Sequence, residues 1–267
     1  IKLLSNSGLE NKLIDCDTFA ETKMLLEKEI QTNRYNYLIA VGGDGLVNLC
    51  LQLVAEKPIC LGVIPAGTGN DFARATGFNG KSVDEIFSIF SRSKPVKIDL
   101  GKAVSADESK WFVQVLSTGF DAIVNSLANK MTWPRGKSKY TIATILILSR
   151  FKSIPYMVEI DGRIFEQNAM LLAVANGESY GGGMRICPGA SNSDGILDVL
   201  IVRPVTKIVL LTIFPKVFKG NHIPHPKIDV YKGKYIKISS PTVAYADGEF
   251  VSQLPLEVTN VPNALTT

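Results

Sequence analysis

The sequence predicts an α/β domain with a parallel sheet, followed by a β-rich and mostly antiparallel domain. In the first third of the chain, apolar runs of strand length alternate with helical patterns, which is the order expected when helices cover the faces of a parallel sheet. After about Lys97 the apolar residues instead follow a period of two, with turn residues between the runs, as in antiparallel strands. The predicted boundary lies between Ser93 and Lys97, which gives domains of residues 1–95 and 96–267. Whether the last strand returns to the first domain stays open.

In the first domain, the run Tyr37–Val41 is almost entirely apolar, which indicates a central strand that is covered on both faces. A helix is predicted over Val47–Val54, a second strand over Ile59–Ile64 and a second helix over Phe72–Thr76. The apolar segment Ile1–Leu4 has the pattern of the last turn of a helix, so we expect that an N-terminal strand and its turn are missing before it.

The second domain contains several short runs with strand periodicity. They are Lys97–Leu100, Trp111–Leu116, Met157–Ile160, Leu171–Val174, Leu197–Val202, Tyr235–Ile238 and Leu256–Val258. Two helical segments interrupt them, one from Asp121 to about Arg150 and one from Thr206 to Phe218.

Composition excludes several classes of protein. The longest apolar stretches, Ile142–Leu148 and Ile208–Phe214, are far shorter than the ~20 residues that cross a bilayer. A net charge of +4 is too small for a dedicated nucleic-acid binder, so no nucleic-acid partner is expected. The four cysteines occur singly, at Cys16, Cys50, Cys60 and Cys187, without the spacing of a disulfide framework or a zinc site. We therefore expect a cytoplasmic protein.

A glycine-rich loop, Gly42-Gly43-Asp44-Gly45, follows the first strand directly and opens a helix. Its backbone amides lie at the positive end of the helix dipole, where a phosphate group binds well. A carboxylate in such a loop cannot face a phosphate itself, so Asp44 is expected to act through a bound Mg²⁺ ion. Glycine loops of this kind also occur for backbone geometry alone, which is the competing interpretation.

A second loop of the same type, Pro65–Arg74, follows the next strand and contains Gly67, Thr68 and Gly69 before a helix start at Asn70 and Asp71. Because ligands of open α/β sheets bind beyond the carboxyl ends of the strands, both loops can converge on one nucleotide. Asp71 alone could equally be a plain N-cap. The P-loop pattern and the dinucleotide-binding pattern are both absent from the sequence.

An ordered set of segments resembles one known family over essentially the whole chain. The segments are Gly42–Asn48, Gly67–Arg74, Ile98–Gly101, Ser117–Ala122, Asn176-Gly177, Tyr180–Ile186, Ser193–Val199 and Asp247–Glu249. Together they resemble the diacylglycerol kinase catalytic-domain family, in particular its bacterial lipid kinases. The resemblance implies an α/β nucleotide-binding domain like that of NAD kinases and phosphofructokinases, followed by a β sandwich, with the active site between them.

The resemblance also implies roles for individual residues. ATP contacts are implied for Gly42, Gly43, Asp44, Gly45, Leu46, Val47, Asn48, Gly67 and Thr68. Asp44, Asp71 and Asp99 are implied to surround Mg²⁺ and the phosphates, and Glu249 to be the catalytic base. Phosphoryl transfer needs little more than positioned phosphates and one group that accepts the proton of the attacking hydroxyl, for which a carboxylate suffices. The local sequence alone indicates that Glu249 is a solvated acidic residue of a hairpin. Asp247, two residues before it, is the alternative candidate for the base.

A second metal site is implied at Asp194 with the main-chain oxygens of Ser191 and Ile196, a ligand set that suits a structural Mg²⁺ or Ca²⁺ ion. The same Asp-Gly pair is also the usual signal of a turn before a strand. The sequence departs from the resemblance at Leu46, where many members have threonine, and at Leu49, where many have glutamate.

Two basic segments, Lys130–Lys139 and Lys216–Lys227, carry interleaved aromatic or apolar residues, which suits either peripheral contact with an anionic membrane or a pair of solvated loops. The only histidines, His222 and His225, are expected on a surface loop and receive no role.

The functional hypothesis is an ATP- and Mg²⁺-dependent kinase of diacylglycerol or a related lipid. A kinase of a soluble hydroxyl compound and a non-catalytic nucleotide- or lipid-binding regulator are the alternatives. The identity of the lipid and the presence of a homodimer stay open.

Overall fold

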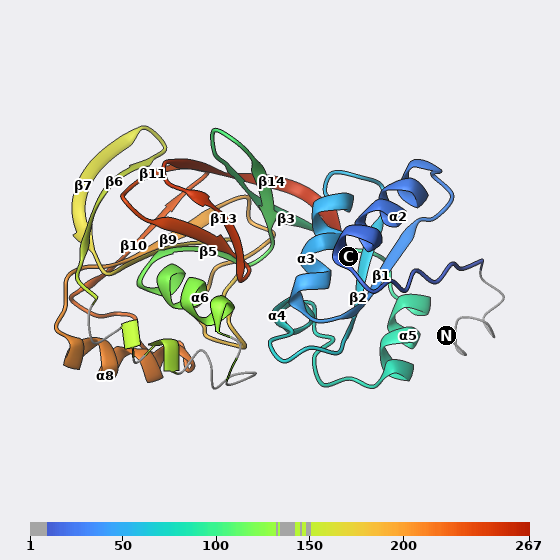
Figure 1. Ribbon diagram of the computed structural model, residues 1–267, viewed down its shortest axis with the longest axis horizontal. Helices are drawn as coiled ribbons and strands as arrows, with labels where there is room; N and C mark the ends of the chain where they lie inside the picture. The colour runs from blue at the N-terminus through green and yellow to red at the C-terminus, as the bar shows by residue number, and fades with distance from the viewer. Residues whose placement is uncertain (1–9, 132, 134–141, 145, 148–150) are drawn as a thin grey trace.

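The computed structural model describes residues 10–131, 133, 142–144, 146–147 and 151–267, which form two lobes side by side (Figure 1). The N-terminal lobe contains α2 (Phe19–Gln31), β1 (Tyr37–Gly42), α3 (Asp44–Val54), β2 (Cys60–Pro65), α4 (Asp71–Ala75) and α5 (Val83–Arg92). Strands β1 and β2 are parallel, with Tyr37 opposite Cys60. Helix α3 buries Val47, Leu51 and Val54, whose spacing places them on one face toward the sheet.

The C-terminal lobe is a sandwich of two sheets with helices below it in Figure 1. One sheet holds β5 (Val115–Gly119), β8 (Leu171–Ala175), β9 (Leu197–Val202), β10 (Ile228–Gly233), β12 (Val243–Ala246) and β13 (Glu249–Gln253), all paired antiparallel. The other contains β3 (Lys97–Val104), β4 (Ser109–Phe112), β6 (Ile154–Ile160), β7 (Arg163–Ala169), β11 (Tyr235–Ser239) and β14 (Leu256–Thr266). Helices α6 (Phe120–Lys130) and α8 (Lys207–Val217) complete the lobe.

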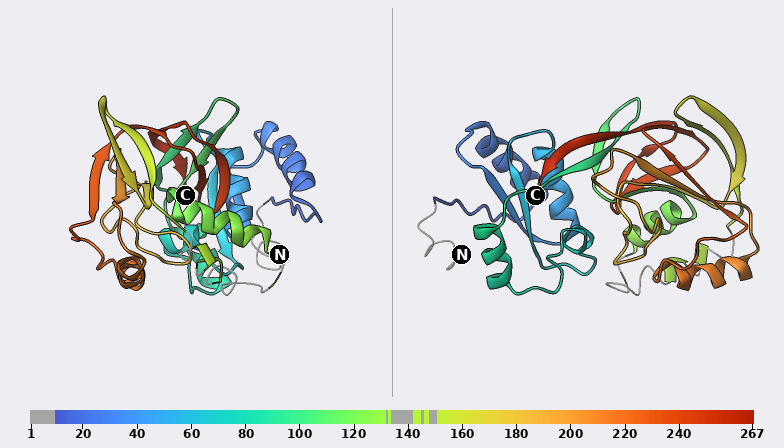
Figure 2. Two further views of the ribbon diagram at one scale, coloured as in Figure 1. Left: turned by 60° about the vertical axis from the view of Figure 1, so that its left-hand side comes forward. Right: turned by 180° about the vertical axis from the view of Figure 1, so that it is seen from behind.

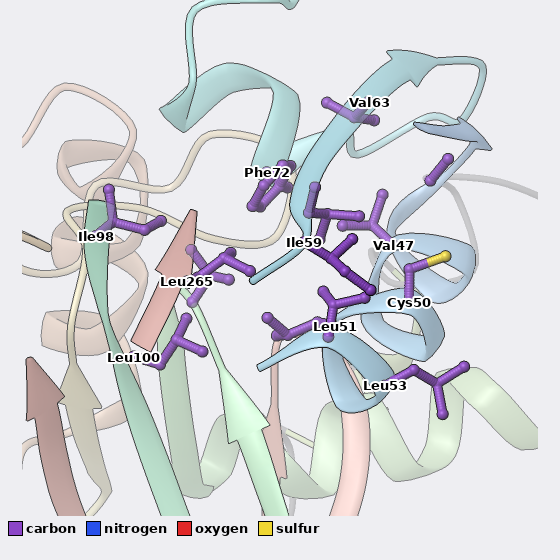
Figure 3. Packing of buried hydrophobic residues seen from close by; sticks show 14 of the residues in the cluster. Val47, Cys50, Leu51, Leu53, Ile59, Val63, Phe72, Ile98, Leu100 and Leu265 are labelled. Carbon is purple, nitrogen blue, oxygen red and sulfur yellow. The ribbon is translucent and has the colours of Figure 1, made fainter. Parts of the chain in front are cut away.

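Strand β14 connects the two lobes. It pairs antiparallel with β11 and β3, and Thr266 near its end pairs parallel with Cys60 of β2. Its Leu265 packs with Leu51 of α3 and Leu100 of β3 in the core of the N-terminal lobe (Figure 3). The views from two further sides show the same long strand running from one lobe into the other (Figure 2). One mixed sheet therefore continues through both lobes.

Each lobe has its own core. Fully buried aliphatic residues of both sheets, among them Leu116, Leu172, Val199 and Ile236, meet inside the sandwich. Burial of each such side chain stabilises the fold by roughly 1.5–3 kcal/mol. Among the described residues, no helix is long and apolar enough to cross a bilayer.

Several expectations about secondary structure are wrong in detail. Strand β1 is an edge strand of the described sheet, and Val41 is 59% exposed, because β1 pairs only with β2. The run Trp111–Leu116 is two strands, since the chain leaves β4 at Phe112 and enters the other sheet at Val115. The helix that begins near Asp121 ends at Lys130, and much of the expected continuation to Arg150 lies outside the described residues.

Candidate active site

The two glycine loops lie in contact, as the sequence predicted. The amide of Ala66 donates to the carbonyl oxygen of Gly42 (3.0 Å), and a Cβ on Gly67 would stand 2.6 Å from the Cα of Gly43. No side chain fits at such a distance, so glycine is required for this approach. The amide ends of α3 and α4 are thereby brought to one place at the carboxyl edge of β1 and β2.

Asp44 joins the first loop to the second. Its two carboxylate oxygens accept hydrogen bonds from the backbone amides of Asn70 (2.8 Å) and Asp71 (2.7 Å). A Cβ on Gly69 would lie 2.4 Å from Asp44 Oδ2, so Gly69 leaves the space in which this carboxylate sits. Asp44 therefore satisfies the free amides at the start of α4, a role that the sequence did not reveal.

Asp71 joins the two lobes. Its carboxylate accepts a hydrogen bond from the backbone amide of Gly182 (2.9 Å to Oδ1 and 3.1 Å to Oδ2), and Arg74 Nε lies 3.9 Å from Oδ1. Burial raises the pKa of Asp71, and the nearby Asp44 carboxylate raises it further. The N-cap of α4 is Asn70 rather than Asp71, so the plain N-cap interpretation of Asp71 is wrong.

Glu249 lies beside the first glycine loop. It begins β13, after a hairpin turn in which Asp247 and Gly248 both have positive φ (48° and 86°), the geometry for which Asp-Gly is favoured. Its Oε1 lies 3.6 Å from the point where a Cβ on Gly45 would stand. An exposed carboxylate of the C-terminal lobe is thus placed beside the first turn of α3.

Asp247, the other acid of the hairpin, has a different environment. Its carboxylate accepts hydrogen bonds from the backbone amides of Val113 (2.7 Å), Gln114 (3.0 Å) and Val115 (3.0 Å), at the point where the chain changes sheets. Burial raises the pKa of Asp247 to about 6, although these amides favour the charged form. Asp247 therefore holds the break between β4 and β5 in place.

A small cavity lies between Asp44, Asp71 and Asp247. Its polar lining comes from Asp44, Asn48, Asp71, Gln114, Tyr180 and Asp247. Tyr180 is 5% exposed, and burial and the neighbouring Asp121 raise the pKa of its phenol well above the ordinary value. Asp121 in turn accepts a hydrogen bond from the Ser117 hydroxyl (2.6 Å). Gln114 and Tyr180 were not predicted as site residues, because only the fold brings them to the glycine loops, and Asp121 was not predicted as the partner of Tyr180.

Comparisons with known proteins agree with this architecture. Residues 1–103 match the diacylglycerol kinase catalytic domain, and residues 114–267 match the YegS C-terminal NAD kinase β sandwich-like domain. A diacylglycerol kinase of Mycobacterium tuberculosis is 40% identical over 232 residues, which are 85% of this chain and 75% of the relative.

The chain belongs to the diacylglycerol kinase family. The resemblance, the two-domain fold class and the assignment as a kinase are confirmed by these matches. A diacylglycerol kinase of Staphylococcus aureus is 29% identical over 263 residues, which are 97% of this chain and 82% of the relative. A crystal structure of a putative diacylglycerol kinase from Bacillus anthracis shares the fold, with a TM-score of 0.76 at 22% identity over 95% of this chain and 84% of that one.

In this diacylglycerol kinase family member, Asp99 does not line the cavity with Asp44 and Asp71. It is 4% exposed, and its oxygens accept hydrogen bonds from the amides of Gly195 (2.7 Å) and Asn263 (2.9 Å). Asp99 thus ties the Asp194 loop to β14. Within the described part of the chain, no group of three or more His, Cys, Asp or Glu side chains is arranged to hold a metal ion.

The Asp194 loop has the geometry of a turn before β9. Asp194 Oδ1 accepts a hydrogen bond from the amide of Ile196 (3.1 Å), and the Ser191 hydroxyl accepts one from the amide of Ser193 (3.3 Å). Carboxylate and carbonyl oxygens in one exposed turn suit a hard cation, so the implied metal site stays a prediction.

The remaining residues implied to bind ATP differ in environment. Thr68 is exposed in the second loop, whereas Val47 is 5% exposed and packs in the core. Leu46 packs against the same core, and a Cβ on Gly42 would lie 2.9 Å from its Cδ2. Asn48 lines the cavity.

The expectation that His222 lies on the surface is wrong. His222 is 2% exposed, its Nε2 lies 3.0 Å from the carbonyl oxygen of Ile186, and burial lowers its pKa. Most of the basic segment Lys130–Lys139 lies outside the described residues, whereas Lys216, Lys219 and Lys227 are exposed.

Proposed function

We propose that this kinase transfers the γ-phosphate of ATP to a hydroxyl group of diacylglycerol or a related lipid, in a reaction that depends on Mg²⁺. The observation that carries the proposal is the position of Glu249 beside Gly45, because it places a carboxylate of one lobe next to the predicted phosphate-binding loop of the other. Phosphoryl transfer requires positioned phosphates and a group that accepts the proton of the attacking hydroxyl.

The phosphates of ATP would bind at the amide end of α3. Gly43 is the N-cap of α3 and offers no side chain to the free amides of its first turn, and the dipole of α3 favours negative charge there. Thr68 is exposed beside them and supplies a hydroxyl donor from the second loop. The contact between Gly43 and Gly67 fixes the distance between the two loops.

The acidic groups of the cavity fit a divalent cation. Asp44 and Asp71 line one cavity, and burial, together with the nearby Asp44 carboxylate, raises the pKa of Asp71. Mg²⁺ bound with ATP would neutralise charge on the phosphate oxygens. Asp99 would act on this site only through the loop and strand that it ties together.

Glu249 would accept the proton of the attacking lipid hydroxyl. The carboxylate of Glu249 is exposed, whereas the carboxylate of Asp247 already accepts hydrogen bonds from three backbone amides. The geometry therefore favours Glu249 over Asp247 as the base. A lipid acceptor also implies that the enzyme works at a membrane surface in a peripheral manner.

The test is transfer of labelled γ-phosphate from ATP with Mg²⁺ to diacylglycerol, phosphatidylglycerol or sphingosine in mixed micelles, with glycerol as a soluble acceptor. Glu249→Gln should lower transfer by about a hundredfold or more while ATP binding persists. The matched control is Glu166→Gln on β7, an exposed residue outside the site, which should transfer at the wild-type rate. Label only in the soluble acceptor would indicate a soluble substrate, and ATP binding without transfer to any acceptor would indicate a regulator.

A further inference from the structure

Helix α8 exposes an apolar face that the proposed reaction does not explain. Ile208, Leu211, Phe214 and Phe218 are 75%, 54%, 37% and 47% exposed. Their spacing of three or four residues places them on one side of the helix. Ile213 and Val217 on the other side are buried against the sandwich and hold α8 to the lobe.

The segment around this face contains no acidic residue. Between Asp198 and Asp229 the sequence has no Asp or Glu, and its basic residues include Lys216 and Lys219, both exposed at the end of α8. A second segment without acids runs from Asp121 to Glu159 and carries six Lys or Arg. Positive charge therefore accumulates in two parts of the chain that are far apart in sequence.

The fold places α8 next to α6, the helix with which the second segment begins. Leu210 of α8 packs against the cluster that contains Phe120, Val124 and Ala128 of α6. Figure 1 shows α6 and α8 on the same side of the C-terminal lobe, away from the hairpin of β6 and β7. Trp133, just beyond the end of α6, is 80% exposed.

We propose that the exposed face of α8 is the surface by which this kinase lies on an anionic phospholipid bilayer. Apolar side chains flanked by lysines are the pattern of a helix that lies in the membrane interface, where apolar groups enter the acyl boundary and lysines meet anionic headgroups. A second copy of the chain is a poorer occupant, because a symmetric contact would place like charges opposite each other. This inference rests on the proposed function in one respect: an enzyme that phosphorylates a lipid must reach the bilayer that contains the lipid.

The test measures binding to vesicles without ATP, so it is independent of catalysis. Wild-type protein should sediment with vesicles of phosphatidylglycerol and phosphatidylcholine, and less at high salt. Lys216→Glu with Lys219→Glu should weaken this binding by about tenfold or more. Ile208→Gln with Leu211→Gln should weaken it as well, because apolar contact is lost.

Two matched controls are available on other surfaces. Lys57→Glu with Lys81→Glu makes the same charge change at exposed positions of the N-terminal lobe, and Ile164→Gln removes an exposed apolar side chain (66%) from β7. Both controls should bind vesicles like the wild type. Equal loss in the controls, unchanged binding of the α8 variants, or no vesicle binding by the wild type would overturn the proposal. So would a wild-type dimer that the α8 substitutions dissociate without affecting vesicle binding.

The same variants separate this inference from the proposed function. In mixed micelles, where the lipid is dispersed in detergent, the α8 variants should retain phosphate transfer. Absence of transfer in every protein, combined with vesicle binding that depends on α8, would refute the proposed function and leave this inference standing.

Discussion

The carboxylate of Asp71 accepts a hydrogen bond from the backbone amide of Gly182, 111 residues later in the chain. This bond connects the first turn of α4 with the loop that carries Tyr180, at the wall of the cavity. It makes the two lobes meet at a charged group rather than at apolar side chains alone. The position of the C-terminal lobe over the glycine loops therefore depends partly on one acidic residue.

Replacement of Asp71 should separate its structural role from its charge. Asp71→Ala leaves the Gly182 amide without its partner and should lower the free energy of unfolding by about 1–3 kcal/mol, measured by urea denaturation. Asp71→Asn keeps an acceptor oxygen, so it should unfold nearer to the wild type while phosphate transfer falls by about tenfold or more. Asp107→Ala, at an exposed turn, is the control. Equal stability of Asp71→Ala and the control would contradict the structural role.

Gly67 and Gly45 should respond in opposite directions to the same added methyl group. In Gly67→Ala the new Cβ would meet the backbone of Gly43 at 2.6 Å, so the loops must separate, at a cost of about 1–3 kcal/mol. At Gly45 the nearest atoms are 3.6 Å and 3.8 Å away, and Gly45→Ala should stabilise α3 by about 0.5–1 kcal/mol. Thermal unfolding followed by circular dichroism compares them. A destabilised Gly45→Ala with an unaffected Gly67→Ala would show that the loop contact is wrong.

Asp247 should make stability depend on pH in a defined direction. Burial raises its folded-state pKa to about 6, above the ordinary value of 3.8, so the folded protein holds this proton over a range in which the unfolded chain releases it. The contribution of this group is therefore fully present below about pH 4 and is lost as the pH rises toward 6, by up to about 1.4 kcal/mol per pH unit.

The measurement is urea unfolding at several values between pH 4 and pH 6. Asp247→Asn cannot titrate, so its unfolding free energy should fall less with rising pH than that of the wild type, and Asp107→Asn should follow the wild type. The variant should also be less stable overall, because one amide group cannot accept the hydrogen bonds that the backbone amides of Val113, Gln114 and Val115 donate to the carboxylate. Identical pH slopes in all three proteins would show that Asp247 does not hold a proton in the folded state.

The predicted structural cation at Asp194 should be visible as a change in thermal stability. If Asp194 and the main-chain oxygens of Ser191 and Ile196 bind Mg²⁺ or Ca²⁺, either ion should raise the Tm of the wild type, and EDTA should reverse the rise. Asp194→Ala should abolish the rise, while Asp107→Ala should retain it. A rise that persists in Asp194→Ala would place the ion elsewhere.

The sequence allowed local features to be predicted well where they depend on neighbouring residues. The glycine loops follow strands and open helices because their amides, glycines and helix starts are contiguous, and the turn at Asp247 and Gly248 forms where Asp-Gly favours positive φ. Strand β9 begins directly after Asp194-Gly195-Ile196 for the same reason. The break at Val113 was not predictable, since the acceptor that stabilises it, Asp247, is over 130 residues away.

From the sequence alone we could infer the order of the elements, the two glycine loops that follow strands and, through the ordered segments, the family. Which acidic residues meet depends on the tertiary structure: Asp44, Asp71 and Asp247 line one cavity, Asp99 accepts a hydrogen bond from the amide of Gly195, and Glu249 lies beside Gly45. The physical reason is that periodicity and turn chemistry act over a few residues, whereas these groups are positioned by strand β14 and by hydrogen bonds between lobes. A carboxylate has the same local sequence pattern whether it caps a helix, ties two loops together or faces a substrate.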